Sequence, residues 1–64
     1  MEKMTLRALR VNKFYTQKVA AEKLGVSEKT LSNWEKGISF PNQKQIETIC
    51  SVYGTSYDYI NFAV

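Results

Sequence analysis

Apolar residues recur at the spacing of α-helices along most of the chain, and the clearest stretch is residues 16–37. Two short helical patterns follow each other there, with Gly25 between them. Because a helix ends most easily at a glycine in the left-handed conformation, Gly25 predicts a tight turn. The apolar positions on the inner side of these two helices are Ala20, Ala21, Leu24, Leu31 and Trp34.

Capping residues and a small residue complete a helix-turn-helix pattern in this stretch. Thr16 and Ser27 have side-chain oxygens that accept hydrogen bonds from the free amides of a helix N-terminus. They are expected to begin helices over about residues 17–24 and 28–36. Ala21 is small enough to let the two helices cross closely, so the stretch predicts a helix-turn-helix unit.

Helical patterns also flank this unit. The pattern over about residues 5–13 predicts an N-terminal helix with Leu6 and Leu9 inward and with Arg7 and Lys13 available to solvent or phosphate. Asn42 and Gln45 have the spacing of a capping box, so they are expected to begin a further helix after a loop. The inward stripe of that helix is Ile46, Ile49, Cys50 and Tyr53.

The C-terminal part of the chain predicts one more short helix. The preceding helix is expected to stop at Gly54, and Ser56 is expected to start the new one. This fifth helix would contain Tyr57, Tyr59, Ile60 and Phe62. Five helices and no strand predict an all-α fold. Since no repeat, linker or low-complexity tract interrupts the pattern, residues 1–64 are expected to form a single domain.

The helix expected at 28–36 divides its side chains into two sides. Leu31 and Trp34 lie on one side, whereas the polar side chains occupy an arc of about 140° on the other, at about 100° per residue. This polar set is Glu28, Lys29, Ser32, Asn33 and Lys36. An ordinary amphipathic surface helix has the same division, so the preceding helix and the glycine turn are what favour a helix-turn-helix. Trp34 is expected in the core rather than on a base-stacking surface.

Basic charge is concentrated in the N-terminal part of the chain. The net charge is +3, but the first 44 residues contain all nine Lys and Arg and four of the six acids, so they carry +5 and the rest −2. This division suits one part that faces phosphate and another that faces a partner, although a basic charge of this size is common. A chain of 64 residues is near the lower limit for a hydrophobic core alone. Dimerisation would therefore help it, and no separate effector domain is expected.

Composition argues against several classes of site. The chain has no histidine and a single cysteine, Cys50, so neither a metal site of the usual kind nor a histidine-based catalytic site can be assembled. Cys50 falls on an apolar stripe and is expected in the core. We expect no enzyme activity, no cofactor and no small-molecule ligand. The N-terminus lacks the apolar run of a signal peptide and no segment is long enough to span a membrane, so a cytoplasmic protein is expected.

Residues 6–62 resemble the Cro/phage-repressor (XRE) family of helix-turn-helix regulators. The resemblance rests on many spaced positions rather than on one motif. The matching residues are Thr16-Gln17, Ala21, Leu24-Gly25-Val26-Ser27, Thr30, Leu31, Trp34-Glu35, Gly37, Pro41, Ile46, Tyr53-Gly54 and Ser56-Tyr57-Asp58. The resemblance implies a compact five-helix domain of lambda-repressor type, with the helix-turn-helix at the second and third helices.

The chain departs from the family pattern in two places. The family usually has glycine or another small or flexible residue just before the leucine that precedes the Thr-Gln pair, and here these two places hold Phe14 and Tyr15. The turn between the first two helices is therefore expected to differ. Val19 stands where the family often has an acid, which predicts a partly exposed apolar position or a local contact.

The resemblance implies that the helix over 28–36 lies in the major groove of DNA. Lys29 would donate to guanine, Asn33 would make the paired contact to adenine, and Glu28 would accept from cytosine. Glu28 would alternatively pair with a neighbouring lysine. Ser32 would contact a thymine methyl group or no base at all.

Phosphate contacts are expected from the helix starts and from nearby cations. The expected set is Arg10, Gln17, Lys18, Ser27, Thr30, Lys36, Asn42 and Lys44. Ser27 and Asn42 are expected to cap their helices whether or not they also bind phosphate. If Gln17 does not bind phosphate, it is a simple exposed helix-start residue. The surface lysines are more often solvated than bound to phosphate. The resemblance also implies an ion pair between Arg10 and Glu35 that joins the first helix to the third.

The resemblance also implies that the aromatic C-terminal segment at 57–64, together with the loop before the fourth helix, forms a two-fold contact between subunits. The interface residues would be Tyr57, Tyr59 and Phe62, although some of them are also needed to close the core. A dimer places two recognition helices about 34 Å apart and selects a near-palindromic operator.

The resemblance thus implies a regulator of phage or mobile-element type that binds double-stranded DNA as a homodimer and represses transcription. The alternative is an antitoxin-like or anti-repressor-like interaction module, in which the apolar C-terminal surface binds a protein and DNA binding is secondary.

Overall fold

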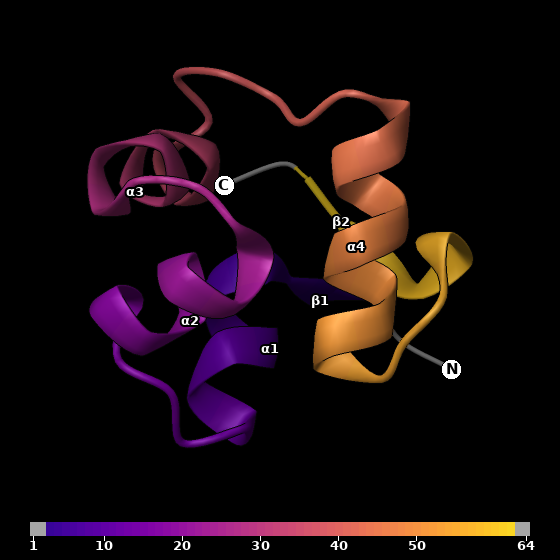
Figure 1. Cartoon of the computed structure of the whole chain (residues 1–64). Helices are drawn as coiled ribbons and strands as arrows, with labels where there is room; N and C mark the ends of the chain where they lie inside the picture. Colours follow the sequence, from indigo (N-terminus) through magenta and orange to yellow (C-terminus); the bar gives the residue numbers. More distant parts are fainter. Residues whose placement is uncertain (1–2, 63–64) are drawn as a thin grey trace.

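Four α-helices, one 3-10 turn and a pair of very short strands make up residues 3–62, the part of the chain that the computed structural model describes (Figure 1). In chain order they are β1 (Met4–Thr5), α1 (Leu6–Asn12), α2 (Gln17–Leu24), α3 (Glu28–Lys36), α4 (Gln43–Tyr53), η1 (Tyr57–Tyr59) and β2 (Ile60–Asn61). α2 and α3 pack against each other, and α1 and α4 contact them from two sides. The two strands bring the ends of the described chain side by side.

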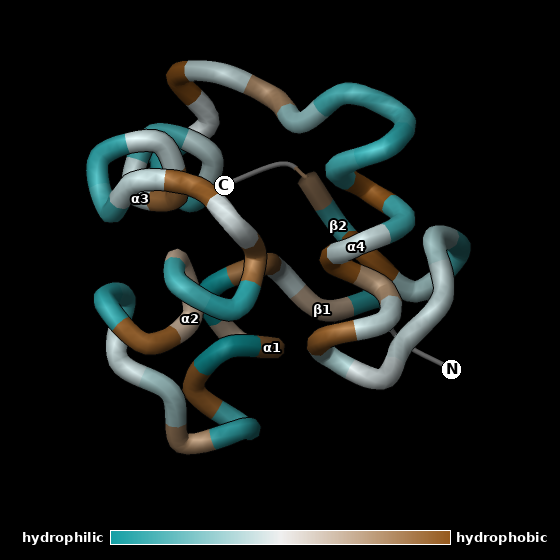
Figure 2. The backbone as a smooth tube through the Cα atoms, in the orientation of Figure 1, coloured by the Kyte–Doolittle hydropathy of each residue, from teal (hydrophilic) through white to brown (hydrophobic). Residues whose placement is uncertain are grey.

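The core lies where these helices meet. Its hydrophobic side chains come from every α-helix and from β2, and along the tube of Figure 2 hydrophobic positions recur in each helix between hydrophilic ones. The buried set is Leu6, Leu9, Ala20, Ala21, Leu24, Leu31, Trp34, Ile49, Tyr53 and Ile60. Ala21 is 2% exposed, which confirms that a small residue stands where the two helices of the motif cross.

The helix-turn-helix has the caps that the sequence predicts. Thr16 Oγ1 accepts from the backbone N–H of Val19 over 3.1 Å, and Ser27 Oγ accepts from that of Thr30 over 3.1 Å. Gly25 lies between the helices with a φ of +74°, so the left-handed turn is present. Both helices begin and end at the predicted residues.

α4 also begins as predicted. Asn42 Oδ1 accepts from the N–H of Gln45 over 2.8 Å, and Gln45 Oε1 accepts from the N–H of Asn42 over 2.8 Å, which completes the capping box. Gly54 ends the helix with a φ of +66°.

The predicted fifth helix is wrong. Only a single 3-10 turn forms at Tyr57–Tyr59, and Ser56 makes no side-chain cap to it. The chain then extends into β2, which pairs in parallel with β1 so that Ile60 lies opposite Met4. Ile60 is 3% exposed, and this extended backbone is what places it in the core. The expectation of no strand is therefore wrong as well, and residues 63–64 of the predicted interface segment lie outside the described residues.

Two further expectations need correction. α1 is shorter than the predicted helix, because Thr5 is its N-cap, accepting from the N–H of Ala8 over 3.1 Å, and Lys13 is its C-cap. Cys50 is half-buried rather than fully in the core, because its side of α4 also lines a surface groove. Among residues 3–62, no helix is long and apolar enough to cross a membrane.

Candidate nucleic-acid interface

The outer side of α3 is polar and the inner side is buried, as predicted. Leu31 is fully buried and Trp34 is 4% exposed, which confirms that the tryptophan belongs to the core. The polar side chains of α3 face outward. Glu28, Lys29 and Lys36 are exposed, and Ser32 and Asn33 are half-buried. Hydrogen-bonding side chains are thus presented on one side of a helix whose other side is anchored.

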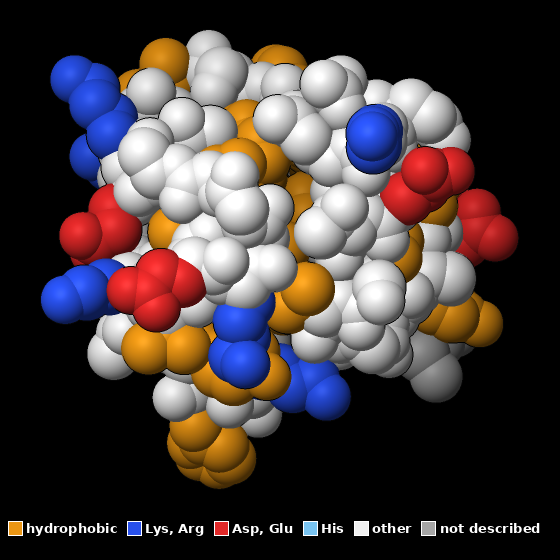
Figure 3. All heavy atoms as spheres, in the orientation of Figure 1, with side chains coloured by type: hydrophobic (Ala, Val, Ile, Leu, Met, Phe, Trp, Pro, Cys, Tyr) orange, Lys and Arg blue, Asp and Glu red, His pale blue; other side chains and the backbone are white. Residues whose placement is uncertain are grey.

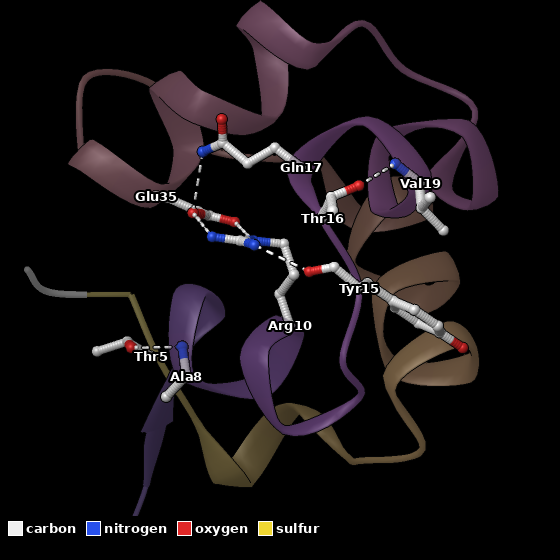
Figure 4. A network of polar contacts seen from close by, with 8 residues as sticks. All are labelled: Thr5, Ala8, Arg10, Tyr15, Thr16, Gln17, Val19 and Glu35. Carbon is white, nitrogen blue, oxygen red and sulfur yellow. Dashed lines mark hydrogen bonds and ion pairs between the residues drawn. The ribbon is translucent and has the colours of Figure 1, made fainter.

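Arg10 of α1 is bonded to Glu35, near the C-terminal end of α3 (Figure 4). Arg10 Nε donates to Glu35 Oε2 over 2.8 Å, and Arg10 Nη2 donates to Glu35 Oε1 over 3.2 Å. The predicted ion pair between these two residues is therefore present. The Glu35 hydrogen bond raises the pKa of Arg10, so the guanidinium stays charged.

Gln17, the first residue of α2, joins the same network. Its Nε2 donates to Glu35 Oε1 over 3.2 Å, and its side chain is half-buried (Figure 4). The alternative in which Gln17 is a simple exposed helix-start residue is therefore wrong. One carboxylate thus ties α1, α2 and α3 together and fixes the orientation of the outer side of α3.

A polar pocket of about 330 Å³ opens beside this network. Its lining residues are Arg7, Arg10, Gln17, Ser32, Glu35 and Lys36. Three residues of the predicted phosphate set come together here, and Ser32, predicted to face a base, lies among them. Arg7, which the sequence leaves open to solvent or to phosphate, also lines this pocket, three residues before Arg10 on α1.

The other predicted phosphate residues lie away from this pocket. Ser27 and Thr30 are at the N-terminus of α3, where Ser27 Oγ also donates to Thr30 Oγ1 over 2.9 Å. Asn42 and Lys44 are at the N-terminus of α4, and Lys18 is exposed near the start of α2. Their side chains lie at three separate helix starts rather than in one cluster.

The hydroxyl of Tyr53 lies near the network but takes no part in it. Tyr53 is 3% exposed, and its Oη has no hydrogen-bond partner among residues 3–62. The pKa of Tyr53 is raised to about 12, first by burial and then by the negative charge of Glu35, while Arg10 acts in the opposite direction. The tyrosine therefore stays neutral at physiological pH.

The aromatic C-terminal surface is on another part of the molecule. Tyr57 and Tyr59 are exposed, and the ring centroids of Tyr57 and Phe62 are 6.0 Å apart. A groove of about 250 Å³ is lined by Phe40, Pro41, Ile46, Tyr57 and Phe62. A neighbouring groove of about 520 Å³ shares two of these and is lined by Gln43, Ile46, Glu47, Cys50, Thr55, Ser56 and Tyr57. Tyr57 and Phe62 of the predicted interface thus line a groove, whereas Tyr59 lines neither.

Phe14 and Tyr15 lie in the turn between α1 and α2. Phe14 has a φ of +61° and is 96% exposed, and Figure 3 shows an apolar projection at the edge of the molecule near this turn. Tyr15 is half-buried, with Lys23 Nζ 5.3 Å from its ring centroid. Val19 is 38% exposed, so it is the partly exposed apolar position that was expected.

Comparison with known proteins also indicates a helix-turn-helix domain. The sequence profile of a helix-turn-helix family matches residues 6–60. The HTH-type transcriptional regulator ImmR of Bacillus subtilis is 36% identical over 55 residues, which cover 86% of this chain and 43% of the relative. The HTH-type transcriptional activator BcrR of Enterococcus faecalis is 36% identical over 53 residues, which cover 83% of this chain and 26% of the relative.

The chain therefore spans less than half the length of either relative. Both relatives are transcriptional regulators by name, in agreement with the expectation that the chain is not an enzyme. No solved structure matches the chain at a significant level.

Proposed function

Because the chain belongs to the helix-turn-helix family of Cro/C1 type, we propose that it is a sequence-specific regulator that binds a near-palindromic operator as a dimer and represses transcription. The observation that carries this proposal is the division of α3. Its inner side is buried through Leu31 and Trp34 and braced by Glu35, while its outer side offers hydrogen-bonding groups. A rigid helix with a polar outer side is what readout of the major groove requires.

Base readout is assigned to the outer side of α3. Lys29 donates to guanine O6 or N7, Asn33 pairs with adenine N6 and N7, and Glu28 accepts from cytosine N4. Ser32 borders the polar pocket. This position supports a contact to the DNA backbone more than a contact to a thymine methyl group.

Phosphate binding is assigned first to the polar pocket. Arg7, Arg10 and Lys36 give it three cations, of which only Arg10 is paired with Glu35. Gln17 adds an amide at the start of α2. The remaining contacts come from the starts of α3 and α4 and from two surface lysines, namely Ser27, Thr30, Asn42, Lys18 and Lys44.

The dimer contact is assigned to the aromatic C-terminal surface. Tyr57 and Phe62 line a groove beside Phe40, and an exposed apolar surface of this kind is typical of an interface. The test is sedimentation equilibrium with and without operator DNA. A mass that remains that of the monomer at all concentrations, with and without DNA, contradicts the dimer.

The same surface favours a second candidate function, in which the chain is an interaction module of antitoxin or anti-repressor type. Two apolar grooves on a small chain would accept a partner protein as well as a second copy. An adjacent toxin gene supports this alternative, and a divergent repressor gene supports the operator-binding regulator.

Selection of bound duplexes from a random library at near-physiological salt tests the proposal. Wild type, Lys29→Ala and Asn33→Ala are compared. The expected result is an enriched palindrome whose preference relaxes at different base pairs in the two variants. Weak binding without base preference that falls steeply with salt contradicts it. A promoter–reporter assay on the selected operator then distinguishes repression from activation, the function named for one of the relatives.

A further inference from the structure

The turn between α1 and α2 holds an aromatic ring out in solvent. The backbone of Phe14 lies at a φ of +61°, a conformation that side chains with a Cβ rarely adopt. At 96% exposure the ring gains almost no burial that would offset this strain. A helix commonly ends at a residue in this conformation, usually glycine, so the end of α1 explains the φ of Phe14 but not the presence of an exposed aromatic ring. A role for the ring outside the folded chain would account for it.

The backbone that carries the ring is held by α1. The N–H of Phe14 donates to the carbonyl of Val11 over 2.9 Å, and the N–H of Tyr15 donates to the carbonyl of Arg10 over 3.3 Å. Arg10 Nη1 returns a hydrogen bond to the carbonyl of Tyr15 over 2.9 Å. The turn is therefore tied to the same arginine that lines the polar pocket.

The sequence around the turn is basic. Residues 3–21 contain five cations and no acid, and Lys13 directly precedes Phe14. Lys18 follows in the first turn of α2. Arg10 is paired with Glu35, whereas Lys13 and Lys18 are exposed on either side of Phe14 in the sequence. An aromatic side chain flanked by cations is complementary to a polyanion that also has apolar surface. The DNA backbone has both, in its phosphates and its deoxyribose sugars.

We propose that Phe14 packs against the deoxyribose sugars of the DNA backbone that flanks each half-site, outside the phosphate bound by the polar pocket. This inference rests on the proposed function, and it extends the interface from α2 into the turn before it. The contact reads no base, because every nucleotide has the same sugar. It also neutralises no phosphate, so it adds affinity without changing the salt dependence.

The test uses the duplex that the wild-type protein selects, in a long form and in a form trimmed at the edge of each half-site. The variants are Phe14→Gly, which removes the ring and suits the positive φ, and Phe14→Tyr, which keeps the ring. On the long duplex Phe14→Gly is expected to bind about tenfold more weakly, while Phe14→Tyr stays within about twofold of wild type. On the trimmed duplex all three proteins are expected to bind equally.

Two further readouts separate this role from a structural one. Phe14→Gly is expected to keep the wild-type base preference and the wild-type slope of affinity against salt. Its thermal unfolding midpoint is expected to equal or exceed that of wild type, so that a lost contact and not unfolding explains the weaker binding.

Equal affinity of wild type and Phe14→Gly on the long duplex overturns the inference while the proposed function stands. A tenfold loss on both duplexes overturns it too, because the ring would then act inside the half-site. A membrane is the alternative polyanionic surface, and co-sedimentation of the protein with phosphatidylglycerol vesicles tests it. Vesicle binding that depends on Phe14, with DNA binding that does not, assigns the ring to a membrane surface instead. A wild-type protein that selects no duplex refutes the proposed function, and that result is seen before any variant is made.

Discussion

Arg10 and Glu35 form a salt bridge that connects α1 to α3 over 2.8 Å between Nε and Oε2. The side chains are 12% and 5% exposed, so solvent screens the interaction only weakly. Glu35 also accepts from Gln17 at the start of α2. Three helices therefore depend on one carboxylate, and the orientation of the outer side of α3 depends on the charge of Glu35.

A double-mutant cycle on this pair tests that dependence. Arg10→Met and Glu35→Leu each leave one charge largely buried without its partner, and each is expected to lower the free energy of unfolding by about 3 kcal/mol. The double variant removes both charges and is expected to lose about 1–3 kcal/mol less than the sum. Urea denaturation followed by circular dichroism measures all four proteins. Additive losses would mean that the two side chains do not interact.

Local signals made most of the helix-turn-helix predictable. Thr16, Gly25 and Ser27 act on residues three or four positions away, so the sequence contains the whole cause of the two helix starts and of the turn. The Arg10–Glu35 pair followed from the family resemblance instead, since nothing in the helical spacing brings these two residues together.

The features that were not predicted depend on contacts distant in sequence. Ile60 reaches the core only because β2 pairs with β1 at the other end of the described chain, and two-residue strands have no period to recognise. The polar pocket likewise joins side chains from α1, α2 and α3. Arg7 belongs to it through the packing of α1 on α3, which the sequence pattern alone does not specify.

Tyr53→Phe is expected to stabilise the protein. The hydroxyl of Tyr53 is buried without a hydrogen-bond partner among residues 3–62, so the folded state loses the hydration of that group. Replacing it with hydrogen is expected to raise the free energy of unfolding by about 1 kcal/mol, and the ring continues to fill its place in the core. Urea denaturation at pH 7 measures the change. A loss of stability would instead show that the hydroxyl makes a favourable contact.

The same tyrosine predicts a fall in stability at alkaline pH. Its pKa is raised from 10.0 to about 12 in the folded protein, mainly by burial. Above pH 10 the unfolded chain therefore releases this proton while the folded protein retains it, which favours unfolding. The stabilisation present below pH 10 is expected to decrease by up to about 2–3 kcal/mol as the pH rises to 12.

Tyr53→Phe is the control for this pH dependence, because other tyrosines and the lysines titrate in the same range. The difference in unfolding free energy between wild type and Tyr53→Phe should widen between pH 10 and pH 12, to the disadvantage of wild type. Parallel curves for the two proteins would contradict the assignment.

Gly25→Ala is expected to destabilise the turn between α2 and α3 through the backbone alone. A Cβ at this position would meet nothing within 4 Å, so no clash contributes. The φ of +74° is the only obstacle, and it is expected to cost about 1–2 kcal/mol. Gly25→Asn is the matched variant, since asparagine tolerates the left-handed conformation better and should cost less. Thermal unfolding of both decides the point, and wild-type stability in Gly25→Ala would show that the turn relaxes without strain.

Arg7→Gln tests whether the polar pocket binds phosphate. Arg7 is exposed at the rim of that pocket, so its loss is expected to leave the fold intact. If it neutralises one phosphate, the slope of log affinity against log salt should decrease by about 1 and affinity should fall equally for all operator variants. Lys23→Gln removes the same charge from α2 at a residue that does not line the pocket, and it should leave the slope nearly unchanged. Equal effects of the two substitutions would mean that only the overall basic charge matters, because a specific phosphate contact distinguishes Arg7 from Lys23.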